Sequence, residues 1–124
     1  MTWQYIAGFF DGEGNVQSFC DRHGRLITKA RMSQRTDVDL VLKEIAKFLT
    51  KQGIRVVMER RLQMGAMQTT LTIAVKEDLV KFYDGIWHFS IVKRDQVKKA
   101  RSDLRRYHAL RRDHGNRYVE YMFA

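Results

Sequence analysis

IAGFFDGEG, residues Ile6–Gly14, joins an apolar segment to two acids and three glycines. Thr2 is a predicted N-cap, so a helix is expected over Trp3–Asp11, and Gly14 is expected to break it. Acids would then lie at the C-terminal end of a helix, where each exposed carboxylate costs about 0.3–1 kcal/mol against the helix dipole. The position of these acids therefore calls for a compensating positive charge.

A divalent cation would supply that charge. Mg²⁺ prefers oxygen ligands, and this helix end offers the carboxylates of Asp11 and Glu13 together with the free carbonyls of its last turn. Gly8 and Gly12 lie four residues apart on one helix face, where the missing side chains let a second backbone approach closely. The stretch predicts two copies of one helix packed together, each with a carboxylate at its foot.

The charge of the chain predicts a polyanionic partner. Its 124 residues include 23 Lys and Arg against 14 Asp and Glu, which gives a net charge of +9. A folded domain this basic usually binds nucleic acid, although such charge can also be only a solvated surface. With 44% hydrophobic residues and no sign of a linker, we expect a single domain over residues 1–124.

Cysteine usage and hydropathy bear on the location of the protein. Cys20 is the only cysteine, which favours a reducing intracellular setting. Whether that setting is an organelle (chloroplast or mitochondrion) or a prokaryotic cytoplasm stays open. No apolar run reaches the roughly 20 residues that cross a bilayer, and the N-terminus MTWQYIAG lacks the features of a signal peptide. We therefore expect no membrane and no secretion, and a core position for Cys20 in the first strand.

Alternating apolar and polar residues predict two pairs of strands. The first pair spans Asn15–Ser33 around a turn at Asp21–Arg25. The second pair spans Ile54–Leu62 and Met67–Val75, with a turn at Gln63–Ala66. Each strand has one largely apolar face, which predicts a sheet that is covered on one side only.

Helical spacing predicts the remaining elements. A helix capped by Thr36 or Asp37 separates the two strand pairs and ends at Gly53. Two more helices are expected over Lys76–Asp84, stopped by Gly85, and over Asp95–Arg112. This order predicts an α+β fold, in which helices cover one face of an antiparallel sheet and leave the other face polar, basic and open.

At Ile6–Gly14 the sequence resembles the LAGLIDADG motif of homing endonucleases, over all nine positions. The αββαββα order inferred above is similar to the fold of that family, which has a saddle-shaped sheet and dimerises through the motif helix. The chain has one copy of the motif, and single-copy members work as homodimers. The resemblance implies a site-specific, Mg²⁺-dependent DNA endonuclease that leaves short 3′ overhangs. Its dimer interface would include Ala7, Gly8, Asp11 and Gly12.

The resemblance also implies roles for the acids. Glu13 matches the essential metal ligand, where the family usually has Asp, and Gly12 would add its backbone carbonyl to the metal. Asp11 matches the first acid of the motif, which lies near the active site and helps the helix to end. Mn²⁺ is expected to substitute for Mg²⁺, and Ca²⁺ is expected to bind without supporting cleavage.

Two further residues complete the implied active site. Gln34, just after the second predicted strand, matches a polar residue that positions water. Lys93 matches a basic residue near the scissile phosphate, with Arg94 as the alternative. These types suit phosphodiester cleavage, which needs an activated water, a Lewis acid and neutralisation of charge on the leaving oxygen.

The polar strand faces are expected to contact DNA, because a two-stranded ribbon fits the major groove. The candidates are Gln17, Asp21, His23, Arg25, Lys29, Arg31, Arg55, Glu59, Arg61, Gln68, Thr70 and Thr72. Lys98, Lys99 and Arg105 of the last helix would add salt-dependent phosphate contacts. Phe19 falls on the same face, which is unexpected unless it meets a thymine methyl group or the strand phase is wrong.

Other motifs fit poorly. DGEGN could begin an EF-hand, but Val16 stands where the loop needs glycine and Arg22 where it needs glutamate. Gln17 occupies the third glycine position of a phosphate-binding loop. The four histidines show no metal-ligand spacing.

Two alternatives to the endonuclease remain. One is an RNA maturase on the same fold, which would bind intron RNA and assist splicing. The other is a DNA-binding regulator that has lost cutting, and the presence of both acids, Gln34 and Lys93 argues against it. Nothing in the sequence excludes the maturase.

Overall fold

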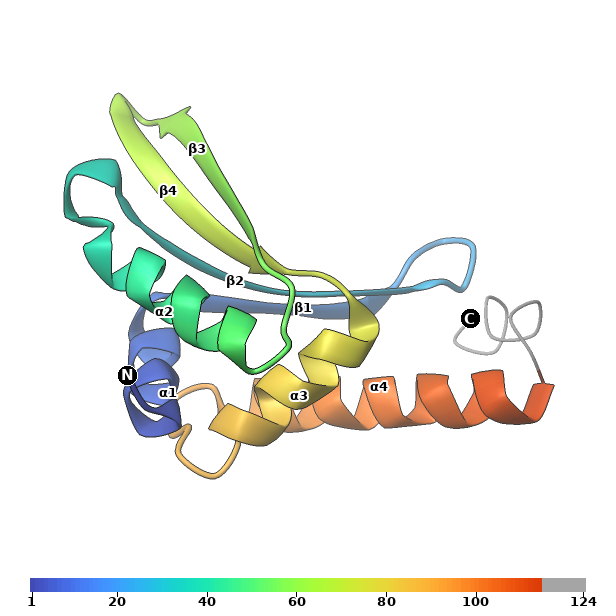
Figure 1. The fold of residues 1–124 in the computed structure, drawn as a ribbon. Helices are drawn as coiled ribbons and strands as arrows, with labels where there is room; N and C mark the ends of the chain where they lie inside the picture. The colour runs from blue at the N-terminus through green and yellow to red at the C-terminus, as the bar shows by residue number, and fades with distance from the viewer. Residues whose placement is uncertain (115–124) are drawn as a thin grey trace.

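The elements follow the order α-β-β-α-β-β-α-α in a computed structural model that describes residues 1–114. They are α1 (Trp3–Glu13), β1 (Gly14–Cys20), β2 (Leu26–Arg35), α2 (Leu40–Lys51), β3 (Val57–Gln63), β4 (Ala66–Ile73), α3 (Lys76–Ile86) and α4 (Arg94–His114), with a 3₁₀ turn, η1, over Thr36–Val38. Figure 1 shows one curved sheet with the helices beneath it. The predicted α+β architecture is therefore confirmed.

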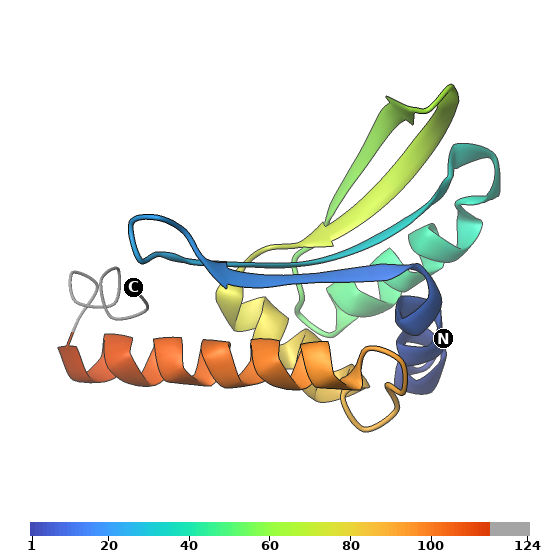
Figure 2. The ribbon, with the colours of Figure 1, turned by 180° about the vertical axis from the view of Figure 1, so that it is seen from behind.

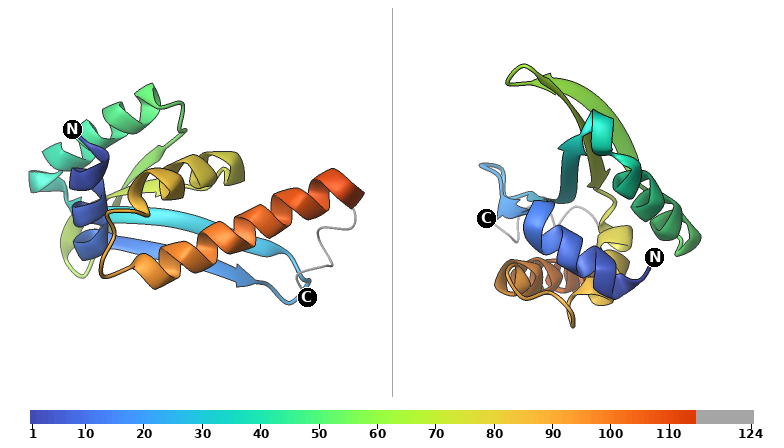
Figure 3. Two further views of the ribbon diagram at one scale, coloured as in Figure 1. Left: turned by 90° about the horizontal axis from the view of Figure 1, so that it is seen from below. Right: turned by 90° about the vertical axis from the view of Figure 1, so that its left-hand side faces the viewer.

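The sheet is antiparallel, with the strand order β1-β2-β4-β3. In β2 the residues Leu26, Thr28, Ala30 and Met32 are buried against the helices, as the alternation predicts. The view from behind in Figure 2 shows that no helix of residues 1–114 covers the opposite face. Figure 3 shows α4 passing diagonally across β1 and β2 on the helix side of the sheet. This uncovered side is called the open face below.

The core fixes α1 against the sheet and the other helices. Ile6, Ala7 and Phe10 of α1 are fully buried. The Phe10 ring packs edge-on against Phe82 of α3 at 5.3 Å between centroids. Burial of one such side chain stabilises a fold by roughly 1.5–3 kcal/mol, so α1 is held firmly and its C-terminal end has a defined position.

The end of α3 differs from the prediction. Gly85 does not stop this helix, which continues to Ile86. A Cβ atom at Gly85 would lie 2.5 Å from the ring of Trp3. The glycine is there because the indole of α1 packs directly on the backbone of α3, and this contact between distant segments has no local sequence signal.

The start of α2 also differs from the prediction. Neither Thr36 nor Asp37 caps this helix, because both lie in η1. The hydroxyl of Thr36 is hydrogen-bonded to that of Thr69 at 3.0 Å, and Thr69 in turn donates to the buried carboxylate of Asp39 at 2.7 Å. The polar side chains therefore join the start of α2 to β4 instead of closing the helix end.

The predicted start of the third strand and the predicted burial of Cys20 need correction as well. The third strand begins at Val57, and Ile54 is a buried residue of the connection that precedes it. Cys20 is exposed, because β1 is an edge strand whose last residue the helices leave uncovered.

Among residues 1–114, no helix is both long and apolar enough to cross a membrane.

Candidate active site and nucleic-acid interface

The motif helix ends at Glu13, two residues beyond the predicted end. Gly14 caps it by donating its N–H to the carbonyl of Phe10, and a Cβ atom at Gly14 would clash with that phenylalanine. Gly12 and Glu13 are both exposed. The helix end thus presents one carboxylate and its last carbonyls at the junction of α1 and β1.

Asp11 anchors the segment between α3 and α4. Its carboxylate accepts hydrogen bonds from the buried hydroxyl of Ser90 at 2.6 Å, the N–H of Ile91 at 2.8 Å and the N–H of Lys93 at 3.1 Å. Burial alone would raise the pKa of Asp11, but these hydrogen bonds hold the pKa below its usual value. The Asp11 carboxylate is therefore committed to contacts within its own chain.

Lys93 is brought to the end of the motif helix. Its side-chain nitrogen donates to the backbone carbonyl of Asp11 at 2.6 Å. Arg94 instead donates to the carbonyls of Ser90 at 2.9 Å and His88 at 3.4 Å. The sequence does not distinguish Lys93 from Arg94 as the basic residue near the phosphate, and in the structure Lys93 is the one at the C-terminal end of α1.

Gln34 lies inside β2 and not just after it, which corrects the predicted strand end. It is directly opposite Thr69 of β4 and two residues beyond Met32, which is paired with Gly14. No hydrogen bond joins Gln34 to Glu13 in residues 1–114. A role for Gln34 in ordering water stays a prediction.

The groups at this helix end carry oxygen atoms, which are the ligands that a hard divalent cation prefers. Mg²⁺ is usually held by one or two carboxylates together with waters and substrate phosphates. The carboxylate of Glu13 and the carbonyl of Gly12 are such ligands. Within the described part of the chain, no three His, Cys, Asp or Glu side chains gather into a metal site, so one chain offers a partial set.

The open face gathers many of the side chains expected to contact DNA. Gln17 is opposite Lys29, Arg31 is opposite Thr72, and Glu59 is opposite Thr70. Arg61 and Gln68 form a further pair of opposite residues. A shallow groove of about 360 Å³ is lined by Lys29, Arg31, Ser33, Val57, Glu59, Arg61, Gln63, Thr70, Thr72 and Ala74.

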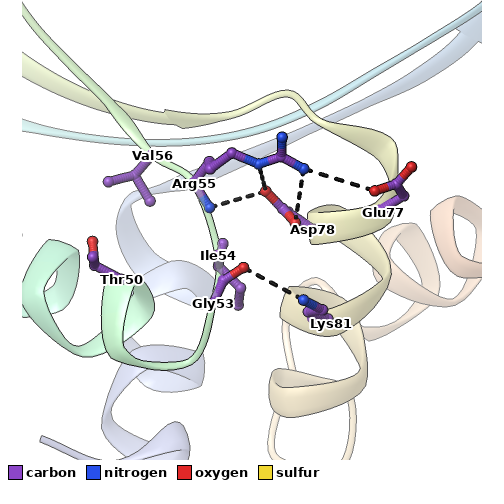
Figure 4. Close-up of a pocket in the computed structure, with 8 residues that line it drawn as sticks. All are labelled: Thr50, Gly53, Ile54, Arg55, Val56, Glu77, Asp78 and Lys81. Carbon is purple, nitrogen blue, oxygen red and sulfur yellow. Dashed lines mark hydrogen bonds and ion pairs between the residues drawn. The ribbon is translucent and has the colours of Figure 1, made fainter.

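Arg55 is not part of this surface. It precedes β3, and its guanidinium donates to the carboxylate of Asp78 at 2.8 Å, with Glu77 at 3.7 Å. Figure 4 shows these residues of α3 in a separate pocket of about 590 Å³, where Lys81 also reaches the carbonyl of Gly53. The prediction that placed Arg55 on a strand is therefore wrong.

The β1–β2 turn and α4 hold the other predicted contacts. The Asp21 carboxylate accepts the N–H groups of His23 and Arg25 at 2.8 and 2.9 Å, which closes the turn. Lys99 donates to the carbonyl of Ser18 at 3.0 Å. The guanidinium of Arg105 lies 3.9 Å from the carboxylate of Asp84. Lys98, Lys99 and Arg105 all lie on α4, so they belong to the helix layer and not to the open face.

Several residues of the open face escaped the sequence analysis. Asn15 is opposite Arg31, and Arg35 is opposite Gln68. Both continue the two-residue alternation of their strands, so extending that period to the strand ends would have found them. Ser33 and Gln63 line the groove in the same way.

One face of α1 is open and has little side chain. Gly8 and Gly12 are exposed, and a Cβ atom added at either would meet no atom of residues 1–114 within 4 Å outside the backbone of its own helix. Ala7 is fully buried in the core, so its expected place in a dimer interface is wrong. Tyr5, which is about half exposed, shares the outer side of the helix with the two glycines.

Comparison with solved structures places this arrangement among known folds. No family model matches the chain, and no curated protein sequence does. The structure resembles the homing endonuclease I-CvuI, solved in complex with its target in the presence of Ca, with a TM-score of 0.67 and 16% identity. It also resembles the LAGLIDADG meganucleases I-CpaMI and I-AabMI, each bound to uncleaved DNA, with TM-scores of 0.69 and 0.63 and identities of 12% and 15%.

The chain has the LAGLIDADG fold. The match with I-CvuI covers 83% of this chain and 65% of that one. Those with I-CpaMI and I-AabMI cover 96% and 95% of this chain but 40% of theirs. In the LAGLIDADG fold of this protein, the motif helix is α1 and the saddle is the open face, as the resemblance implied.

Proposed function

We propose that the chain is one subunit of a homodimeric, site-specific DNA endonuclease that requires a divalent metal. The observation that supports this most strongly is that Glu13 and Lys93 lie at one end of the motif helix of a LAGLIDADG fold. A carboxylate for a metal and an ammonium for a phosphate are two of the groups that phosphodiester hydrolysis needs.

Each chain's residues have a defined part in this proposal. Glu13 and the carbonyl of Gly12 hold Mg²⁺, which when bound supplies a Lewis acid and lowers the pKa of water. Lys93 neutralises charge at the scissile phosphate, and Gln34 orders water. Mn²⁺ replaces Mg²⁺ in cleavage, whereas Ca²⁺ supports binding alone. The products carry short 3′ overhangs.

Two features of α1 support the proposed homodimer. Gly8 and Gly12 are exposed, and no side chain of the described residues covers the space beside them, so a second copy of the helix can approach its backbone closely. One chain also offers a single exposed carboxylate at the helix end, whereas cutting two DNA strands needs one site for each. Two copies of Glu13 meet that need.

The open face binds the duplex. Its strands bring Lys29, Arg31 and Arg61 together with Gln17, Gln68 and two threonines, which are side chains that bind base edges in the major groove. The net charge of +9 favours the approach of the polyanion and makes affinity fall as salt rises.

A selection followed by a cleavage assay tests the proposal. A library of randomised duplexes is enriched for binding in Ca²⁺, and the enriched duplexes are then incubated in Mg²⁺. We expect double-strand cleavage in Mg²⁺ and Mn²⁺ but not in Ca²⁺. Replacement of Glu13 by Gln should abolish cleavage while binding in Ca²⁺ is kept, and Glu44→Gln in α2 is the matched control.

Each outcome is informative. Binding without cleavage by the unaltered protein would point to a regulator that only binds DNA. Cleavage that survives Glu13→Gln would remove this residue from the active site.

A further inference from the structure

An apolar pair lies on the open face, which is mostly polar but also includes Val57 and Ala74 of the groove. Phe19 of β1 is directly opposite Ile27 of β2. Ser18 donates to Asp103 of α4 at 2.7 Å, so the next side chain along β1 points to the other side of the sheet. Ile27 is followed by the buried Thr28, which places it on the open face too. The strand phase inferred from the sequence is therefore right, and the aromatic ring lies on the DNA side.

The pair forms one small apolar spot. The Cβ atoms of opposite residues in an antiparallel sheet are about 4.5–5.5 Å apart, and Phe19 remains 51% exposed. Gln17 and Lys29 form the next pair on one side, and Asp21 and Arg25 follow toward the turn on the other. Polar and charged groups thus frame the spot along both strands.

The small size of the apolar spot and its polar neighbours determine which kind of partner can bind there. Two side chains are far smaller than the roughly 800 Å² that each partner buries in a stable protein interface. Lysine, arginine and glutamine beside them match phosphates and base edges. In the major groove, the only apolar group that any base presents is the C5-methyl group of thymine.

We propose that Phe19 and Ile27 bind a thymine methyl group in each half of the target. This inference rests on the proposed DNA binding and adds to it one fixed feature of the target sequence. Because the neighbouring pairs along both strands, Gln17 with Lys29 and Asp21 with Arg25, are polar or charged, the methyl contact makes the protein prefer thymine over a base that lacks the methyl at the position that Phe19 and Ile27 face.

Uracil tests the contact directly, since it differs from thymine only in the missing methyl group. Duplexes enriched from the randomised library in Ca²⁺ are resynthesised with uracil at each enriched thymine in turn. At one position per half-site, uracil should weaken binding about fourfold, the value of one buried methyl group. Phe19→Ala should bind the thymine and uracil forms equally well.

A control variant separates this contact from general effects. Leu40, an exposed apolar residue at the start of α2, lies in the helix layer, and Leu40→Ala should keep the preference for thymine. The inference is overturned if no thymine is enriched, or if Phe19→Ala retains the thymine-to-uracil ratio of the unaltered protein. Failure to enrich any duplex would overturn the proposed function itself, and a change of oligomeric state in Phe19→Ala would assign the spot to a protein contact.

Discussion

The side-chain nitrogen of Lys93 lies 2.6 Å from the backbone carbonyl oxygen of Asp11, although the two residues are 82 positions apart in the chain. A cation at this end of α1 offsets the negative end of the helix dipole. Glu13 leaves the same helix end two residues later. The fold therefore presents an ammonium and a carboxylate together, and the ammonium depends on the segment that Asp11 anchors.

Replacement of Lys93 tests its role at the phosphate. Lys93→Ala should slow single-turnover cleavage in Mg²⁺ about a hundredfold, which is typical for loss of one group that stabilises transition-state charge. Binding in Ca²⁺ should change much less. Arg94→Ala is the matched control, because the hydrogen bonds of the Arg94 side chain within residues 1–114 go to the carbonyls of its own loop. If the two variants cleave equally fast, Lys93 is not the catalytic cation.

Loss of Ser90 tests the anchoring of this segment. Ser90→Ala removes a buried donor from a charged carboxylate, so the free energy of unfolding should fall by about 1.5–3 kcal/mol. Urea denaturation measures this quantity. Ser102→Ala on the exposed side of α4 should change it by less than about 0.5 kcal/mol. A loss confined to cleavage, with stability unchanged, would contradict the anchoring role.

Two glycines with opposite environments test the proposed dimer. At Gly8 an added Cβ atom meets nothing within 4 Å among residues 1–114 outside the backbone of its own helix, and Gly8→Leu replaces a poor helix former, so the folded subunit should be at least as stable. It should nevertheless block close helix approach and give monomers in sedimentation velocity. Gly85→Ala should do the reverse, lowering the melting temperature through its clash with Trp3 while dimers persist. Dimers of Gly8→Leu would show that the glycine face is not the interface.

Acid stability tests the buried Asp78. The hydrogen bond from Arg55 is the main cause that holds the pKa of Asp78 below its usual value. Because the folded pKa lies below the unfolded value of about 3.9, the ionised form stabilises the fold above that value. This contribution is lost as the pH falls through the folded pKa.

The free energy of unfolding of the unaltered protein should therefore drop more steeply below about pH 5 than that of Asp78→Asn. Urea titrations at a series of pH values measure the two slopes. Parallel curves would show that the ion pair with Arg55 adds nothing to the pH dependence of stability.

The parts of the fold that follow from local periodicity were accessible from the sequence. The alternation in Leu26–Met32 gave the correct buried face of β2, and the acids of Ile6–Gly14 lie at the C-terminal end of a helix, as expected. Both inferences use neighbours within a few residues, where strand and helix geometry fix which side chains share a face.

The corrections share a different origin. Gly85 resembles a helix stop because glycine often ends helices, but here it accommodates Trp3 from another helix. The Asp11–Ser90 hydrogen bond joins residues 79 apart. Ala7 was placed in the interface because it belongs to the motif, although its helical position faces the core. Such contacts depend on tertiary packing, which no local pattern contains.

Every residue of β3 is exposed, and this strand is held to the rest of the molecule mainly by its pairing with β4. Substitutions of its outward side chains therefore remove little or nothing from the core around Phe10 and Met32. A lineage carrying this protein can exchange those side chains freely while the scaffold survives. Under the proposed function, a change of target sequence would therefore cost the least stability along this edge of the open face.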